Sequence, residues 1–316
     1  MSAVRVGMLR MRASLAILLA GLGLAALAQP ADSHLQLDVG LGHETQSSPV
    51  FQLSPEGNIL YLDGQQGLRG SHLRTSLQGS ANWNWEQGIS TALAVDATVK
   101  GSPDTPDLDF MSVSIQPAIH RPWGSASIGL GLNLLSYDVG GHHFRDSTGI
   151  QVDWTQSDGH SLWGVVAEVS SYAHAPEFSA MDAKAASLVA LRQWTDPLPG
   201  IDGLDLSAIV AREVNDHGFG DLSNHSAMVT GSLRWNWLGA DCSVGHGWRQ
   251  AIFEDNVFAG ETARTDHAVM TDLAVQWSLS ATHFIRLEYN AVRNASSTRL
   301  YDNNFEQWSV TLRSVW

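Results

Sequence analysis

Thirteen histidines are the side chains of this sequence best suited to bind a metal ion or to move protons. The candidates fall in or near expected loops and strand ends: the pair His142-His143, His217 beside Asp216, and His225. Adjacent histidines on a strand point to opposite faces, and none of these spacings matches a closed zinc site. We therefore predict no metal site and no cofactor.

A hydrolase would need a serine nucleophile within reach of a histidine base. His225-Ser226 and His283 supply these residue types. The membrane-embedded phospholipases and lipid A deacylases, however, carry Ser-Asn after the histidine, whereas here Ser223-Asn224 precede His225. We expect no catalytic residues and keep a lipid-hydrolysing barrel only as the weakest alternative.

The composition is acidic, poor in charge and rich in glycine and tryptophan. With 18 Lys+Arg against 32 Asp+Glu, the formal charge of −14 excludes ordinary polyanion binding. A hydrophobic content of 44% excludes general disorder, and charged residues at 16% fall well below the roughly 25% of soluble domains. Because no segment after the N-terminal region has the ~18 continuous apolar residues of a spanning helix, an all-β membrane protein is favoured.

Residues 1–28 have the pattern of a secretory signal peptide, which leaves 29–316 as the folded domain. Three arginines precede an apolar run over 15–27, and Ala26-Leu27-Ala28 is a small-residue cleavage site. Cleavage would remove three arginines and no acid, so the charge would move from −14 to −17. We expect export, with no disulfide inside the chain because it has a single cysteine, Cys242.

From residue 29 onward the dominant pattern is strict alternation of apolar and polar residues, which predicts strands. Residues 73–85 and 227–237 are the clearest cases, with leucine, glycine and tryptophan on one face and polar residues on the other. Fourteen such runs follow one another, near 34–46, 70–85, 88–100, 108–122, 125–137, 146–156, 160–174, 182–194, 202–214, 225–237, 240–252, 265–278, 281–293 and 304–316.

The connections alternate between long and short. Long loops are expected at 47–69, 101–107, 138–145, 175–181, 215–224, 253–264 and 294–303, and 195–201 is the longer exception among the tight turns. A tryptophan lies near the end of every even-numbered run: Trp85, Trp123, Trp154, Trp194, Trp237, Trp277 and Trp316. Both features predict a transmembrane antiparallel β-barrel of about 14 strands, with long loops outside and a periplasmic aromatic girdle.

The last run alternates and closes on Trp316, which resembles the C-terminal signal of Gram-negative outer-membrane barrels. This implies recognition by the barrel-assembly machinery, insertion among outer-membrane lipids, and localisation in the outer membrane. The alternative fold is a secreted, soluble β-sandwich, in which the apolar faces of the strands would point inward.

Inside a closed barrel the polar face should line the lumen. The candidates are Asp38, Arg74, Gln78, Asp96, Lys100, Gln151, Asp153, Glu168, Arg234, Asn236, Asp272, Arg286, Glu288 and Asn290. Further acids would make the mouth negative: Asp104, Asp107, Asp216, Asp221, Glu254, Asp255 and Glu261. Eight strands are filled by side chains and sixteen leave a channel, so fourteen predict a pore that is open or narrowed by a loop.

Short motifs in the C-terminal third resemble a known family. Arg264-Thr265-Asp266 opens one run, and Asn294-Ala295-Ser296-Ser297 leads to Leu300-Tyr301-Asp302. They are similar to the barrel of surface lipoprotein assembly modifiers, which implies a fourteen-stranded barrel that helps to deliver lipoproteins to the cell surface. The sequence departs from that family because no repeat domain fits before the first run.

We therefore expect a passive channel or transport pore for small solutes, without nucleic-acid partners. The main alternative is an export barrel gated by a partner such as a lipoprotein.

Overall fold

A computed structural model describes residues 32–53, 59–103, 109–257 and 260–316. The predicted signal peptide, residues 1–28, lies outside the described residues. Asp104 and Asp107 of the expected acidic mouth lie outside them as well.

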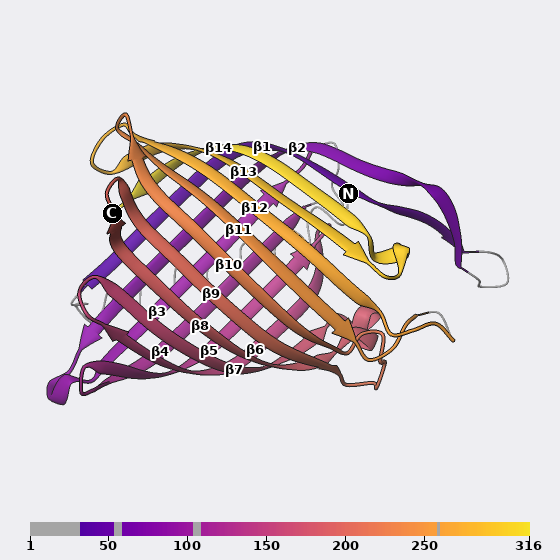
Figure 1. The fold of residues 1–316 in the computed structure, drawn as a ribbon, viewed down its shortest axis with the longest axis horizontal. Helices are drawn as coiled ribbons and strands as arrows, with labels where there is room; N and C mark the ends of the chain where they lie inside the picture. The colour runs from indigo at the N-terminus through magenta and orange to yellow at the C-terminus, as the bar shows by residue number, and fades with distance from the viewer. Residues whose placement is uncertain (1–31, 54–58, 104–108, 258–259) are drawn as a thin grey trace.

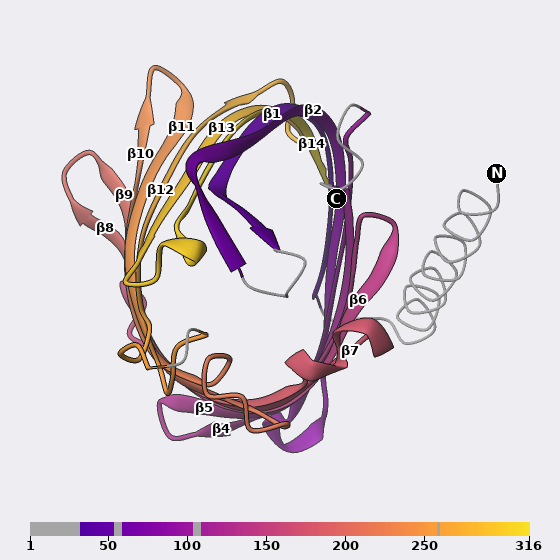
Figure 2. The same ribbon diagram turned by 90° about the vertical axis from the view of Figure 1, so that its right-hand side faces the viewer.

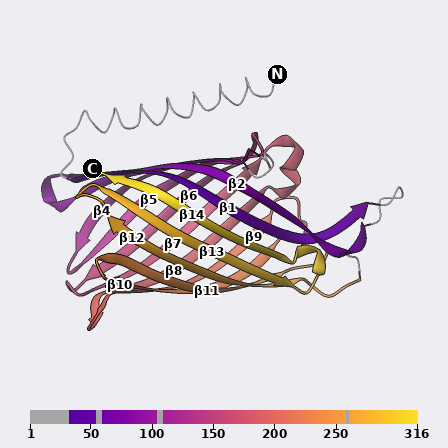
Figure 3. The same cartoon turned by 90° about the horizontal axis from the view of Figure 1, so that it is seen from above.

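The chain forms a single closed antiparallel sheet of fourteen strands (Figure 1), as the alternation predicted. The strands are β1 (Asp32–Leu53), β2 (Ile59–Asn84), β3 (Ser90–Gly101), β4 (Phe110–Trp123), β5 (Ala126–Val139), β6 (His142–Ser157), β7 (Ser161–His174), β8 (Ala183–Leu198), β9 (Ile201–Asn215), β10 (Asn224–Trp237), β11 (Ala240–Phe253), β12 (Thr265–Ser278), β13 (His283–Ser296) and β14 (Asn303–Val315). Each strand pairs with its sequence neighbours, and the strands run obliquely around the barrel (Figure 3).

The barrel closes where β14 meets β1. The register runs from Gln36 opposite Val315 to Ser47 opposite Asn304. Leu35 and Trp316 add a reciprocal pair of backbone hydrogen bonds of 2.9 and 2.8 Å at the end of this seam. Closure pairs the backbone N–H and C=O groups that the edge strands of an open sheet would leave without hydrogen bonds in hydrocarbon.

The two faces of the sheet are the reverse of those in a soluble protein. Large apolar side chains point outward and stay exposed, as Leu41 at 68% and Val169 at 65% show. The buried set is mainly polar and includes Glu44, His72 and Lys100. An apolar outer face around a polar inner face is the pattern of a membrane-spanning barrel and excludes a sandwich with an apolar core.

The connections at the two ends differ in length, as expected. One end has the 3-10 segment η1 (Glu86–Gly88) and turns of a few residues, whereas the other end has most of the longer loops, with η3 (Pro176–Met181) and η4 (Arg299–Tyr301). None of the helical segments within the described ranges is long and apolar enough to cross a membrane.

The prediction of a long loop was wrong for three segments. The segment 138–145 is a two-residue turn, in which Gly140 and Gly141 take φ of +57° and +77° as a tight hairpin requires. The segment 195–201 is also mostly strand, because only Pro199 and Gly200 separate β8 from β9. In both cases strand pairing continues across residues that composition alone marks as loop.

The third wrong loop, 47–69, is mostly an extension of the β1–β2 hairpin. The two strands stay paired as far as Leu53 and Ile59, with a register shift between Pro49 and Val50. Figure 1 shows this hairpin reaching beyond the neighbouring strands, and Figure 2 shows it in front of the barrel opening.

The turn between β6 and β7 is stabilised by one carboxylate, and this gives a pH prediction. Asp158 accepts hydrogen bonds from the backbone amides of Ser161 (2.6 Å) and His160 (3.0 Å) and from the Ser161 hydroxyl (2.9 Å). The bond from the Ser161 amide is the main reason why the pKa of Asp158 lies below its ordinary value. The turn should therefore be fully stabilised above the ordinary carboxylate pKa and should loosen as pH falls through the lowered value.

The measurement is hydrogen exchange of the Ser161 amide against pH. Protection should fall at acid pH in the wild type, whereas in Asp158→Asn it should be weak at every pH. A protection profile that is the same in both proteins would contradict the prediction.

Candidate functional site: the polar inner face

The predicted lumen residues all lie on one face of the sheet. Side chains alternate between the two faces of a strand, and the exposed apolar residues mark the outer face. Asp272 next to Leu273, and Glu168 next to Val169, therefore lie on the inner face, and the other predicted residues follow the same alternation. On β3, where the contrast is weaker, the register decides: Asp96 lies opposite Gln78 and Lys100 opposite Arg74. The predicted residues therefore share the inner face of the sheet, on β1, β2, β3, β6, β7, β10, β12 and β13.

The inner face at the seam is held by ion pairs. Arg313 of β14 donates two hydrogen bonds to Asp38 of β1, of 2.9 and 2.8 Å, and a third of 3.3 Å to Gln276. Arg286 contacts Glu288 at 2.6 Å. A small cavity of about 110 Å³ lies against this cluster, with Arg74, Gln78 and Glu288 in its lining. Residues from β13 to β2 line this one space because the inner face is concave.

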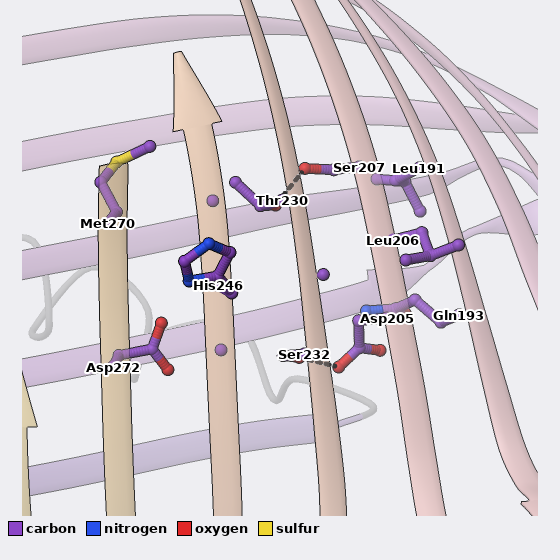
Figure 4. Close-up of a pocket in the computed structure, with 13 residues that line it drawn as sticks. Leu191, Gln193, Asp205, Leu206, Ser207, Thr230, Ser232, His246, Met270 and Asp272 are labelled. Carbon is purple, nitrogen blue, oxygen red and sulfur yellow. Dashed lines mark hydrogen bonds between the residues drawn. The ribbon is translucent and has the colours of Figure 1, made fainter. Parts of the chain in front are cut away.

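A larger recess of about 400 Å³ lies on the inner face of β8–β12. Figure 4 shows its polar groups on β9, β10 and β12. Ser207 and Thr230 share a hydrogen bond of 2.6 Å, and Asp205 accepts one of 3.1 Å from Ser232. Leu191, Gln193 and Met270 add apolar and amide surface. The recess can therefore form hydrogen bonds with the hydroxyl groups of a small solute and pack against its carbon skeleton.

Two glycines of β11 leave the space that forms this recess. A Cβ on Gly245 would overlap both carboxylate oxygens of Asp272, and a Cβ on Gly247 would lie 3.0 Å from the Thr230 methyl group. Within the described residues Asp272 has no hydrogen bond or ion pair, whereas Asp205 lies 3.4 Å from Arg234. Asp272 is thus an uncompensated negative charge beside an open space.

A third cluster lies on β1–β3, toward the end with the longer loops. Lys100 contacts both carboxylate oxygens of Glu44, at 2.7 and 2.9 Å, and lies 5.1 Å from the centre of the Phe110 ring. The Glu44 side chain is only 2% exposed. Beside it, His72 shares a 2.9 Å contact with Gln307. Glu44, His72 and Lys100 are all buried, so this cluster is a packed part of the inner face.

The remaining predicted lumen residues make looser contacts. Asp153 lies 3.5 Å from His120, and Glu168 lies 3.5 Å from the Asn133 amide. Asn236 instead stabilises the β10–β11 turn, where it contacts Asp241 and accepts a bond from the Gly239 amide. Gln151 lies beside Gly131, which adds no side chain of its own. Asp96 and Asn290 have no partner among the described residues.

The sequence prediction omitted four residues that organise the inner face: Glu44, His72, Asp205 and Arg313. All four lie at inward parity on predicted strands, so the alternation could have found them. Nothing in the alternation, however, tells which inward residues pair with one another.

The motif residues that resemble a surface lipoprotein assembly modifier contact one another across neighbouring loops and strand ends. The Arg264 guanidinium lies between the rings of Phe253 and Tyr301, at 3.4 and 3.6 Å from their centres. Ser296 donates a 2.6 Å hydrogen bond to Asp266. These contacts fasten the ends of β11, β12 and β13, which gives the motif residues a structural role.

The histidine candidates do not assemble a catalytic or metal site. His225 is exposed on the outer face, whereas the adjacent Ser226 points inward, so the two side chains are on opposite sides of the sheet. His143 lies between Asp138 (3.0 Å) and Asp146 (3.3 Å). Within the described part of the chain no group of three or more residues could hold a metal ion.

The seven tryptophans of the predicted girdle all lie at the short-turn end of the barrel. Trp123 and Trp237 are more than 60% exposed, at 68% and 64%. Trp85 donates a hydrogen bond of 2.9 Å to Thr91 and otherwise remains exposed. Five of the seven are exposed, and Trp154 and Trp194 are half-buried. Indoles gathered at one end of an apolar band are the arrangement expected where a membrane meets water.

These features place the chain in the class of transmembrane antiparallel β-barrels. No family model matches the sequence, and no curated protein matches it either. OmpT of Vibrio cholerae is similar in structure with a TM-score of 0.48 and 8% identity, over 90% of this chain and 97% of that chain. OccK2 of Pseudomonas aeruginosa, solved in complex with glucuronate, has a TM-score of 0.46 and 9% identity, over 90% and 96% of the two chains.

An anion-selective porin from Comamonas acidovorans has a TM-score of 0.44 and 8% identity, over 90% of this chain and all of that chain. At these scores and identities the likenesses assign no function. The class follows from the chain's own closed sheet.

Proposed function

We propose that the protein is a passive diffusion channel for small polar solutes in the outer membrane of a Gram-negative bacterium. The observation that carries this proposal is the recess of about 400 Å³, lined by both polar and apolar groups, beside the unpaired Asp272. A barrel whose inner side chains only filled the interior would pair such a carboxylate or cover it. Solutes would move along the polar wall, filtered by width and charge.

The proposed channel prefers cations. Asp272 contributes a negative charge inside. Five described acids lie in two of the longer loops: Asp216, Asp221, Glu254, Asp255 and Glu261. Asp216 and Glu254 pair with Lys184 and Arg212, which leaves Asp221, Asp255 and Glu261 without a cationic partner among the described residues. Two of the seven acids expected at the mouth lie outside the described residues. Negative charge at a pore entrance concentrates cations over a Debye length of about 10 Å at 0.1 M salt.

The proposed orientation has the longer loops outside the cell and the short turns in the periplasm. The exposed tryptophans would then mark the periplasmic interface, and the last strand would engage the barrel-assembly machinery before insertion. Export of residues 29–316 after cleavage of a signal peptide is part of the same proposal.

The test is single-channel recording of residues 29–316, refolded and inserted in a planar bilayer. Stable ohmic steps are expected, with a reversal potential of the sign given by cation preference in a salt gradient. Correct insertion without current would contradict the channel and favour an export barrel gated by a lipoprotein partner. Fatty-acid release from phospholipid would instead favour the hydrolase alternative.

A further inference from the structure

An arginine lies on the outer, lipid-facing side of the barrel, sandwiched between two tryptophans. Arg192 of β8 is directly opposite Trp163 of β7, and Trp194 follows two residues later on the same face. The guanidinium carbon lies 4.0 Å from the centre of one Trp163 ring and 4.3 Å from that of Trp194. Leu206, the cross-strand neighbour on β9, is exposed to the same surroundings.

The charge of Arg192 is not neutralised by the protein. Within the described ranges no hydrogen bond or ion pair reaches this side chain, and its Nε is buried without a partner. The two rings hold the guanidinium by cation–π contacts but supply no acceptor for its N–H groups. The two Nη atoms are not among the buried atoms without a partner, so they remain accessible to a ligand.

We propose that Arg192, Trp163 and Trp194 form a binding site for the phosphate of a phospholipid headgroup. A phosphate matches the planar fork of an arginine, and it supplies the counter-charge that an arginine at the edge of hydrocarbon needs. The site lies at the short-turn end, level with the exposed tryptophans, where headgroups meet the protein. The proposal rests on the membrane-spanning fold and is independent of channel activity.

A matched control is present on the same face. Arg121 of β4 also points outward near a short turn, opposite Ile128, and it too has no partner among the described residues. It is exposed, however, and no aromatic ring holds its guanidinium in place. Comparison of the two arginines therefore separates an organised site from general attraction between an arginine and lipid.

The experiment counts lipids that remain bound in native mass spectrometry. The protein in maltoside micelles is titrated with dioleoylphosphatidylglycerol or with dioleoylglycerol, which lacks the phosphate. Wild type and Arg121→Gln should each retain one tightly bound phospholipid and no tightly bound diacylglycerol. Arg192→Gln should bind this phospholipid at least about tenfold more weakly. The heat-modifiable gel shift confirms that each variant is folded.

Two further variants keep the test decisive. Arg192→Lys keeps the charge but loses the fork, so its affinity should be intermediate, and Trp163→Leu should weaken binding although Arg192 remains. Equal binding by wild type and Arg192→Gln, or equal loss in Arg121→Gln, would overturn the proposal. Stabilisation by inorganic phosphate in lipid-free micelles would point to a site for free phosphate and would also overturn it.

Discussion

Replacing Glu44 by glutamine should lower the free energy of unfolding in lipid vesicles by about 3–5 kcal/mol, the usual cost of leaving one member of a buried ion pair alone. Lys100 is only 9% exposed at its side chain, and both of its hydrogen bonds go to Glu44. The Phe110 ring is the other close neighbour of the Lys100 ammonium group, but it cannot neutralise the positive charge as a carboxylate does. The measurement is urea unfolding followed by tryptophan fluorescence.

The paired variant tests the reason for this loss. Glu44→Gln combined with Lys100→Met removes both charges and should recover most of the lost stability. Asp96→Asn is the matched control, since this inward carboxylate on the same strand as Lys100 has no partner and should change stability little. A double variant as unstable as Glu44→Gln would show that packing, not charge, accounts for the loss.

Charge changes at Asp272 should have the largest effect on ion selectivity. One charge about 5 Å from a passing ion in water contributes roughly 0.8 kcal/mol, which corresponds to about a fourfold change in ion partition. We expect Asp272→Asn to lower the cation-to-anion permeability ratio by about 2–4-fold, and Asp272→Lys to lower it by up to about tenfold. Reversal potentials in a salt gradient measure both.

A position on the outer face provides the control. Asp202 of β9 is exposed at the parity of Leu206, so Asp202→Asn removes the same charge outside the lumen and should leave selectivity unchanged. The effect of Asp272 should shrink at 1 M salt, where the Debye length is about 3 Å. Equal selectivity in wild type and Asp272→Lys at low salt would place the conduction path away from the recess.

The strand count and the two faces could be predicted from the sequence because each depends on a local signal with a period of two residues. Leu73 and Arg74 differ in polarity, so alternation alone assigns them to opposite faces. The hairpin turn at Gly140-Gly141 was missed because glycines flanked by histidines and acids have the composition of a long loop. Only the backbone pairing of β5 with β6 identifies the turn.

The interior contacts required more than local pattern. Asp38 pairs with Arg313, 275 residues further along the chain, and this pairing depends on barrel closure and register. The recess likewise depends on Gly245 lying next to Asp272 of the neighbouring strand. In the sequence alone, Gly245 and Gly247 are only small residues within an alternating run.

The seam between β1 and β14 has a consequence for how the barrel forms. Closing a loop of 275 residues costs about 5 kcal/mol of chain entropy by its length dependence alone, and no seam contact can form before the last strand is available. Until then two strand edges remain unpaired and can join with other chains. High contact order should make closure the slow step of folding, so aggregation will compete with refolding most strongly at high protein concentration.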